Sequence, residues 1–422
     1  MRGSKRIGAL LTAAMFAIAL GACGRDDTGA STEKAGGISS GPAKGEITVW
    51  AMGTEGDKLS VLAKDFEAAN PGTTVKVTAF PWDAAHDKIA TAIAGRTTPD
   101  ISLVGTTWMG EYAKTGALDP VPSGLDKNAF FPGAWDTNVV NGTPYGVPWY
   151  VETRLIYYRT DLAQKAGVEP PTSWQGLKDF AAALKQKAGA RWGINLMPGG
   201  QGSWQTFMPF AWQAGASITG GDGKQYTLDS PAMTKALAYY KSFFDEGLAP
   251  KQAIENLEQQ FVDGQIGAFV SGPWHIGLLR DQGGKAFDGK WSVMAMPRER
   301  SGTSFVGGGN LVVFKDAKNR DAAWKFVQYL SRPEVQLKWY QTATDLPAVK
   351  SAWQNQSLAG DKLLATFGQQ LNDAKSPPAV ATWEQVANVV DTEIERVVKG
   401  GESPDAAAAA IQQKASGIGT GT

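Results

Sequence analysis

Apolar and polar positions alternate between residues 46 and 104 in a way that predicts strands and helices in turn. Short apolar or alternating runs predict strands, and longer runs with apolar side chains three and four residues apart predict helices. The predicted strands are 47–50, 75–78 and 101–104, and the predicted helices are 57–69 and 84–94. Strand, helix and strand in this order predict right-handed crossovers and a parallel or mixed sheet.

Ligands of such sheets bind at the carboxyl ends of the strands, and this directs attention to the loops that follow them. These loops read Ala51–Gly56, Phe80–Asp83 and Gly105–Trp108. All three contain polar groups and two contain a tryptophan, which either covers the core or contacts a ligand. The recurrence of such loops at one sheet edge makes them candidates for a ligand site.

The pattern changes after Pro148, where residues 150–158 form a long extended run that carries Glu152 and Arg154. Most of the remaining chain has the periodicity of helices, and strands return in short runs. Helices are predicted at 174–187, 231–246, 255–263, 321–330, 333–340, 384–399 and 404–414, and strands at 266–270, 292–296 and 311–314. Pro404 follows Ser403, a capping residue before a proline at the first helical position.

This order of elements predicts a chain that builds one lobe, crosses to a second, returns to the first and ends in the second. The predicted boundaries are 46–151 with 272–312 for the first lobe, and 152–271 with 313–418 for the second. The predicted fold class is therefore α/β, with a mixed sheet flanked by helices in each lobe and a multi-strand connection between the lobes.

The N-terminus has the pattern of an export signal. Three basic residues precede the uncharged run 7–22, which is too short to span a membrane comfortably. The run ends in Leu-Gly-Ala before Cys23, the only cysteine, and these four residues resemble the lipobox of bacterial lipoproteins. The sequence thus predicts a signal peptide over 1–22, a lipid anchor on Cys23 and a location on the outer face of the bacterial cell membrane. An ordinary signal peptide with an incidental cysteine is the alternative. The segment 23–45, rich in small and polar residues, predicts a flexible tether.

Composition argues against several classes of function. Hydrophobic residues make up 43% of the chain, and a formal net charge of +0 without a basic block argues against nucleic acid as a partner. Only His86, His275 and one cysteine could form a Cys/His metal site, and no phosphate-binding loop occurs, so neither a metal nor a cofactor is expected. The enzymatic alternative is a secreted glycosidase with Glu152 and Glu384 as acid and base, although no local motif supports this pair.

The chain has 15 tryptophans, and many of them stand beside polar or turn residues. Sugars present apolar C–H faces and a rim of hydroxyls, so an indole ring covers the face while charged and amide groups bind the rim. Four tryptophans lie in helical or core-like patterns and are expected to be structural: Trp174, Trp192, Trp324 and Trp339.

Several segments together resemble family 1 extracellular solute-binding proteins, the maltose-binding-protein-like sugar receptors of ABC importers. The resemblance covers the whole body and is carried by Tyr145–Arg159, Asp161-Leu162, Pro171–Trp174, Ser271–Trp274, Phe305–Asn310 and Asp321–Leu330. It implies a two-lobe periplasmic-binding-protein-like fold and a monomeric, non-catalytic receptor. Such a receptor captures a mono-, di- or short oligosaccharide by hinge closure and delivers it to the ABC permease. The alternative within the fold is a receptor for another small solute.

The resemblance also implies which residues contact the sugar. Loops of the first lobe and the crossing supply polar and aromatic groups, tryptophans of the second lobe supply stacking surfaces, and a later segment supplies backbone and amide donors. The implied residues are Thr54, Glu55, Trp82, Asp83, Thr107, Trp108, Glu152, Arg154, Trp204, Trp274, Gly308, Asn310 and Trp383. Thr54-Glu55 stands where the maltose receptor has an acidic-basic pair, so the sugar need not be the same.

Overall fold

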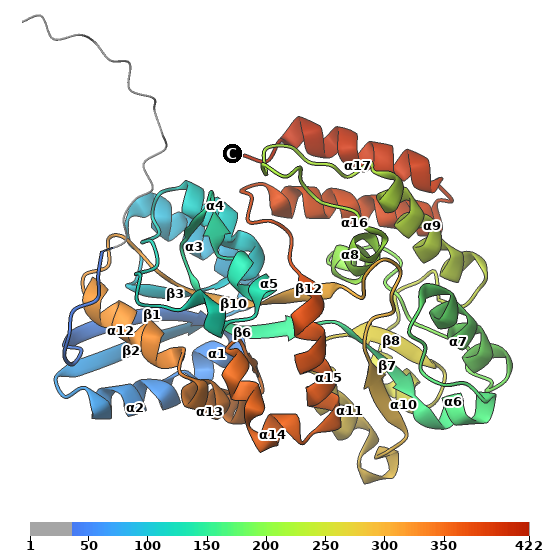
Figure 1. Ribbon diagram of the computed structural model, residues 1–422, viewed down its shortest axis with the longest axis horizontal. Helices are drawn as coiled ribbons and strands as arrows, with labels where there is room; N and C mark the ends of the chain where they lie inside the picture. The colour runs from blue at the N-terminus through green and yellow to red at the C-terminus, as the bar shows by residue number, and fades with distance from the viewer. Residues whose placement is uncertain (1–35, 422) are drawn as a thin grey trace, which may run out of the picture. The chain divides into compact units, whose positions relative to one another are not determined.

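The computed structural model of the protein describes residues 36–421 (Figure 1). The predicted signal peptide, Cys23 and the first part of the predicted tether lie outside the described residues. Strands gather into a larger and a smaller sheet, with one separate hairpin. Between residues 36 and 421, no helix has both the length and the apolar character needed to cross a membrane.

The larger sheet has the strand order β11-β6-β10-β3-β1-β2, with β12 paired to β10. Strand β1 runs parallel to β2 and β3, whereas β10 runs antiparallel to β3 and β6. The strands are β1 (Gly45–Met52), β2 (Thr73–Phe80), β3 (Ile101–Gly105), β6 (Val147–Thr153), β10 (Ser304–Val313), β11 (Leu346–Pro347) and β12 (Ala374–Lys375). The mixed sheet predicted for the first part of the chain is therefore present.

Helices cover both faces of the larger sheet because its strands are apolar on both sides. Leu103 and Leu311 pack with one group of helices, whereas Val104 and Val312 pack with the other. The first group is α2 (Ser60–Ala69), α12 (Arg320–Leu330) and α13 (Pro333–Ala343); the second is α3 (Ala85–Gly95) and α4 (Met109–Lys114). Helix α1 (Gly53–Lys58) directly follows β1. Stacking of Trp149 on Trp339, with ring centroids 4.6 Å apart, joins β6 to α13.

The smaller sheet is antiparallel, with β7 between β8 and β9. Its strands are β7 (Leu155–Arg159), β8 (Ala268–Ser271) and β9 (Trp291–Met294). The helices of this part are α6 (Thr160–Ala166), α7 (Trp174–Gln186), α8 (Ser203–Ala214), α9 (Pro231–Asp245), α10 (Leu257–Val262), α11 (His275–Gly283), α16 (Trp383–Lys399) and α17 (Pro404–Ile418). The predicted cap of α17 is confirmed, because Ser403 Oγ accepts a hydrogen bond from the amide of Ala406 over 3.2 Å.

The remaining short elements connect these parts. They are β4 (Val139–Val140), β5 (Thr143–Pro144), α5 (Pro132–Asp136), α14 (Gln356–Ala359), α15 (Lys362–Gln370) and the 3-10 turns Trp82–Ala84, Thr106–Trp108, Lys127–Ala129, Lys285–Phe287, Lys350–Gln354 and Leu371–Asp373. Two of these turns are formed by residues from the predicted polar loops after β2 and β3.

Strand pairing divides the chain differently from the predicted lobe boundaries in two places. Residues 272–294 were expected in the first lobe, but α11 packs against α10, and β9 pairs with β7 in the smaller sheet. Helices α12 and α13 were expected in the second lobe, but they pack against the larger sheet. Strand β10 extends over ten residues and already pairs with β6 at Val306. The chain thus returns to that sheet after β9, and it remains there through α13.

Part of the predicted tether is fixed to the folded body. The carboxylate of Asp321, in the first turn of α12, accepts hydrogen bonds from the amide and hydroxyl of Ser39 over 2.6 and 2.8 Å. Lys325 donates to Ser39 Oγ over 2.9 Å, and Ala43 donates to Asn70 Oδ1 over 2.9 Å. Although burial acts in the opposite direction, the hydrogen bonds from Lys325 and Ser39 lower the pKa of Asp321. Polar contacts therefore order a segment that composition predicts to be flexible.

Substitution of Asp321 by alanine is expected to release residues 36–44 without unfolding the body. Two hydrogen bonds to a charged group contribute about 1.5–3 kcal/mol each, mostly to local rather than global stability. Hydrogen exchange should therefore quicken at least about tenfold at Ser39 and Ala43 and stay unchanged in β1. Asp316→Ala, at an exposed carboxylate between β10 and α12, is the control. Equal exchange in both variants would contradict the role of Asp321.

Candidate functional site

Two tryptophans at the carboxyl edge of the larger sheet lie directly over glycines. A Cβ on Gly53 would lie 2.9 Å from Trp82 Cδ1, and a Cβ on Gly105 would lie 3.1 Å from Trp108 Cε2. Gly53 has a φ of 51°, in the left-handed region that favours glycine. The two indoles meet edge to face with centroids 5.7 Å apart, and both remain partly exposed. The predicted loops after β2 and β3 therefore form one aromatic surface.

Glu55 connects this surface to β6. It lies two residues after Gly53 in α1, is 7% exposed and is close enough to the Tyr150 hydroxyl to affect its pKa. Burial, together with the charge of Glu55, raises the pKa of the Tyr150 hydroxyl well above its ordinary value, so Tyr150 is a neutral donor. Asp345, between α13 and β11, lies close enough to Glu55 for the two carboxylates to interact electrostatically. Burial and Glu55 raise the pKa of Asp345 to about 8.

The chain passes from the larger sheet to the smaller one between Thr153 and Leu155, and alternate residues around this crossing are polar. Tyr150, Glu152 and Arg154 are two residues apart, so they share one side of the extended chain. A Cβ on Gly307 would lie 2.7 Å from Phe305 Cε1 and 2.9 Å from Glu152 Oε1, so glycine in β10 leaves room for both side chains. Glu152 Oε2 pairs with Arg154 Nη1 over 2.8 Å, with side-chain exposures of 19% and 9%. Burial raises the pKa of Glu152, and Arg154 opposes this.

Arg154 leads to the third exposed indole. Its guanidinium lies 4.6 Å from the ring centroid of Trp274 and also donates to Gln205 Oε1. Trp274 is 44% exposed, and its ring folds back over Gly272, where a Cβ would lie 2.0 Å from the indole. A glycine thus leaves room for each of the three indoles, those of Trp82, Trp108 and Trp274.

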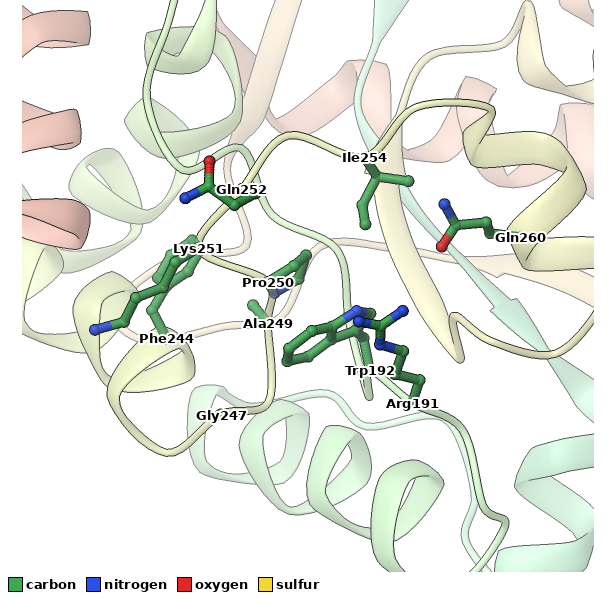
Figure 2. A pocket seen from close by; sticks show the side chains of 10 residues that line it. All are labelled: Arg191, Trp192, Phe244, Gly247, Ala249, Pro250, Lys251, Gln252, Ile254 and Gln260. Atoms are coloured by element: carbon green, nitrogen blue, oxygen red, sulfur yellow. The ribbon is translucent and has the colours of Figure 1, made fainter.

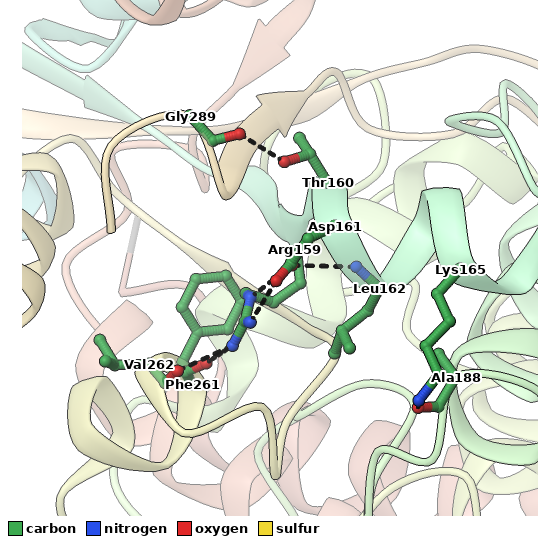
Figure 3. A network of polar contacts seen from close by, with 9 residues as sticks. All are labelled: Arg159, Thr160, Asp161, Leu162, Lys165, Ala188, Phe261, Val262 and Gly289. Atoms are coloured by element: carbon green, nitrogen blue, oxygen red, sulfur yellow. Dashed lines mark hydrogen bonds and ion pairs between the residues drawn. The ribbon is translucent and has the colours of Figure 1, made fainter. Parts of the chain in front are cut away.

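Polar contacts of His275 hold the turn that carries Trp274. His275 Nδ1 lies 2.7 Å from Ser271 Oγ, and its Nε2 lies 3.0 Å from Glu258 Oε1 in α10. Burial lowers the pKa of His275, and Glu258 opposes this shift. At the other end of α10, Arg159 donates to the carbonyls of Phe261 and Val262 over 2.6 and 2.9 Å (Figure 3). Arg159 and His275 thereby join α10 to β7 and to the Trp274 turn.

We name the resulting set of side chains the cross-strand row. It consists of Trp108, Trp82, Glu55, Tyr150, Glu152, Arg154 and Trp274. The row has indole rings at its two ends and carboxylate, phenol and guanidinium groups between them, so it combines apolar faces with strong hydrogen-bond donors and acceptors. Such a set suits a ligand with apolar faces and many hydroxyls.

Three further predicted residues lie beside the row. Thr54 is an exposed residue of α1, Asp83 is exposed in the turn after β2, and Thr107 is half-buried beside Trp108. No contact with the row connects them, so their part in ligand binding stays a prediction.

Four predicted ligand contacts have structural roles that account for their positions. Trp204 and Trp383 are 4% and 1% exposed and meet edge to face with centroids 5.1 Å apart. Asn310, 1% exposed, donates to Thr137 Oγ1 over 3.0 Å. Gly308 has a φ of 127°, and a Cβ there would lie 2.2 Å from a backbone oxygen of β6. Neither buried indole offers a face to a ligand in this structure, so Trp204 and Trp383 are left out of the row.

A buried carboxylate fixes Trp204 in this core. Asp391 of α16 accepts hydrogen bonds from the amides of Gly202 and Trp204 and from Ser203 Oγ, over 2.8, 2.7 and 2.8 Å. It therefore satisfies the first donors of α8, which have no partner within the helix. Periodicity misses α8 because its residues are apolar on nearly all sides and include Pro209.

Tyr150, Gln205 and Asp345 also neighbour the site and were not predicted from the sequence. Tyr150 could have been found from its alternation with Glu152 and Arg154. Gln205 and Asp345 carry no such signal, because they approach only through tertiary packing. Over residues 36–421, no group of three or more His, Cys, Asp and Glu side chains has an arrangement suited to a metal ion.

Comparison with known proteins gives one consistent result. The family model of the bacterial extracellular solute-binding proteins matches residues 61–366. The sugar-binding protein MalE of Xanthomonas citri is 35% identical, with a TM-score of 0.84 over 89% of this chain and 97% of that one. The predicted two-lobe α/β fold is thereby confirmed.

Two relatives known by sequence span nearly the whole chain. The diacetylchitobiose-binding protein of Streptomyces coelicolor is 27% identical over 96% of both chains. A maltooligosaccharide ABC transporter solute-binding lipoprotein of Streptococcus pneumoniae is 24% identical over 92% of this chain and 91% of the relative. The chain belongs to the family of bacterial extracellular solute-binding proteins.

Proposed function

We propose that the protein is the carbohydrate-binding subunit of an ABC importer and captures a mono-, di- or short oligosaccharide. The observation that carries this proposal is the cross-strand row, in which indole rings flank a series of charged and phenol groups that runs from the edge of the larger sheet to the smaller one. The sugar-binding relatives support the same class of ligand.

The row can supply enough binding energy for capture. Micromolar affinity requires about 8 kcal/mol. Hydrogen bonds to charged groups contribute about 1.5–3 kcal/mol each, and an apolar sugar face buried on indole adds more, before the cost of ordering is subtracted. Glu152 pairs with Arg154, and this pairing favours a binding role over the acid–base role of a glycosidase.

Import through a permease also requires attachment of the protein to the membrane and a change of conformation when the sugar binds. We infer that a lipid on Cys23 holds the monomer at the outer face of the cell membrane, and that the permease receives the sugar there. A sugar that contacts groups on both sides of the crossing favours the closed arrangement of the lobes, because only differential contact shifts such a population. If small-angle X-ray scattering detects no compaction with a saturating sugar, hinge closure is excluded.

A thermal-shift screen with a panel of sugars tests the proposal. One or more neutral sugars should raise the midpoint by several degrees, because a ligand stabilises the state that binds it, whereas amino acids should not. Trp82→Leu and Trp274→Leu should each weaken binding roughly tenfold to a hundredfold, since a lost stacking surface costs about 1.5–3 kcal/mol.

Trp353→Leu is the matched control. Trp353 is half-buried and donates to the carbonyl of Pro347 over 2.9 Å, outside the row. Its loss should lower the midpoint of the free protein but leave the sugar-induced shift intact. Unchanged affinity in both row variants would contradict the proposed site, and steady release of reducing ends from a glycan would establish the glycosidase instead.

A further inference from the structure

A pocket separate from the cross-strand row lies on the part of the chain that contains the smaller sheet. It has a volume of about 480 Å³ and shares no residue with the cross-strand row. The pocket is formed by the segment after α7, by the end of α9 with its following loop, and by the start of α10 (Figure 2). Its lining residues are Arg191, Trp192, Phe244, Gly247, Ala249, Pro250, Lys251, Gln252, Ile254 and Gln260.

Trp192 forms the flat wall of this pocket, and its backbone is fixed by two hydrogen bonds. Its amide donates to the carbonyl of Gln265 and its carbonyl accepts from Gly267, both over 2.9 Å. Sequence analysis expects Trp192 to be structural, but its indole is only partly buried and faces the pocket. Pro250 and Ile254 add apolar surface around it (Figure 2).

The charge in this pocket differs from that of the cross-strand row. The Arg191 guanidinium lies 5.6 Å from the indole centroid of Trp192, and the Lys185 ammonium lies 5.3 Å from it. Lys185 already donates to the carbonyl of Gly247, whereas Arg191 is exposed beside the indole. No acidic side chain is among the ten lining residues. The pocket therefore lacks the carboxylates that would accept hydrogen bonds from a neutral sugar.

Lys251 also lines the pocket, but its ammonium points away from Arg191 (Figure 2). It lies 3.9 Å from Asp245, and both side chains of this pair are largely exposed. Arg191 is thus the cation that can meet an anion on the face of Trp192, with a planar guanidinium suited to a carboxylate.

We propose that this pocket binds a small organic anion with a flat apolar body, the class that includes aromatic carboxylates. The apolar body lies on the indole of Trp192 against Pro250 and Ile254. The carboxylate meets the Arg191 guanidinium at the edge of the ring. This site is separate from sugar capture and does not depend on it.

Titration of the ¹⁵N-tryptophan-labelled protein with 2-naphthoate tests the proposal. The indole signal of Trp192, assigned by its absence in Trp192→Phe, should shift in a saturable way with a dissociation constant of roughly 0.1–1 mM. The neutral probe 2-naphthalenemethanol should bind at least about tenfold more weakly, because it lacks the charge-assisted contact.

Arg191→Gln should weaken 2-naphthoate binding about tenfold or more, whereas the neighbouring Lys251→Gln should change it less than about twofold. Both residues are exposed, so both variants should keep the thermal midpoint and the sugar response of the parent protein. Shifts centred on Trp82 or Trp274, equal binding of the neutral probe, or unaltered affinity in Arg191→Gln would each overturn the proposal. Failure of sugar binding in the parent protein would count only against the proposed transport function.

Discussion

Substitution of Arg154 by methionine is expected to lower the free energy of unfolding by about 3–5 kcal/mol and to abolish sugar binding. The change leaves Glu152 without its cation in a place where only 19% of its side chain is exposed. It also removes the group that faces Trp274 at 4.6 Å and that donates to Gln205. Chemical denaturation and calorimetric titration measure the two effects separately.

The loss of stability in Arg154→Met should depend on pH. Burial already raises the pKa of Glu152, and removal of Arg154 takes away the interaction that opposes this. A carboxyl whose pKa is raised in the folded state binds more protons there than in the unfolded chain, so its contribution to stability falls as pH rises. The difference between parent and variant should therefore be small near pH 4 and larger at pH 7.

Two further variants separate the structural role of Arg154 from its binding role. Glu152→Gln with Arg154→Met removes both charges and should recover most of the lost stability, but no sugar binding. Arg280→Met breaks an exposed pair, in which the atoms of Arg280 and Asp361 are 3.5 Å apart, and should cost less than about 1 kcal/mol. Full sugar binding by the double variant would place Arg154 outside the site.

The part of the site nearest the first three strands could be predicted because local patterns determine it. The alternation of 47–50, 75–78 and 101–104 with helices fixes a parallel arrangement, and the loops after these strands must then meet at one edge. Trp82 and Trp108 do meet there. Gly105, three residues before Trp108, is a local signal for where that indole lies, whereas Gly53 meets Trp82 only in the folded chain.

The same patterns could not show where the extended run 150–158 changes sheets. Its alternation continues without a break, yet Thr153 pairs in the larger sheet and Leu155 in the smaller one. The full length of β10 could not be predicted either. Gly307–Gly309 pair with β6, but three glycines in a row do not produce the alternation of apolar residues that predicts a strand. Tertiary packing decides both features.

Burial of individual tryptophans was the least predictable property. Trp383 begins α16 beside polar residues, as an exposed indole would, but it is 1% exposed against Trp204. The partner that covers it, Trp204 of α8, is distant in sequence, and α8 lacks the helical period that would have predicted it. A turn-like neighbourhood therefore does not separate a ligand contact from a core residue.

The Asp345→Asn variant is expected to be more stable than the parent protein at pH 7, by on the order of 4 kcal/mol, and to lose this advantage as pH falls toward 4. Burial and the charge of Glu55 raise the pKa of Asp345 from 3.8 to about 8. Between these values the folded state holds a proton that the unfolded chain releases, so stability falls as pH rises through this window. Asparagine is neutral throughout and keeps an oxygen for the Trp339 Nε1–H, which Asp345 accepts over 3.0 Å.

Denaturant unfolding of both proteins from pH 4 to pH 8 measures this difference, and Asp316→Asn at an exposed carboxylate is the control. A constant difference across the range would show that Asp345 does not hold the proton. Asp345 lies beside Glu55, so the proton also prevents two like charges from meeting within the cross-strand row. For this reason the parent protein should bind its sugar more weakly above pH 8, where Asp345 ionises, whereas Asp345→Asn should retain its affinity there.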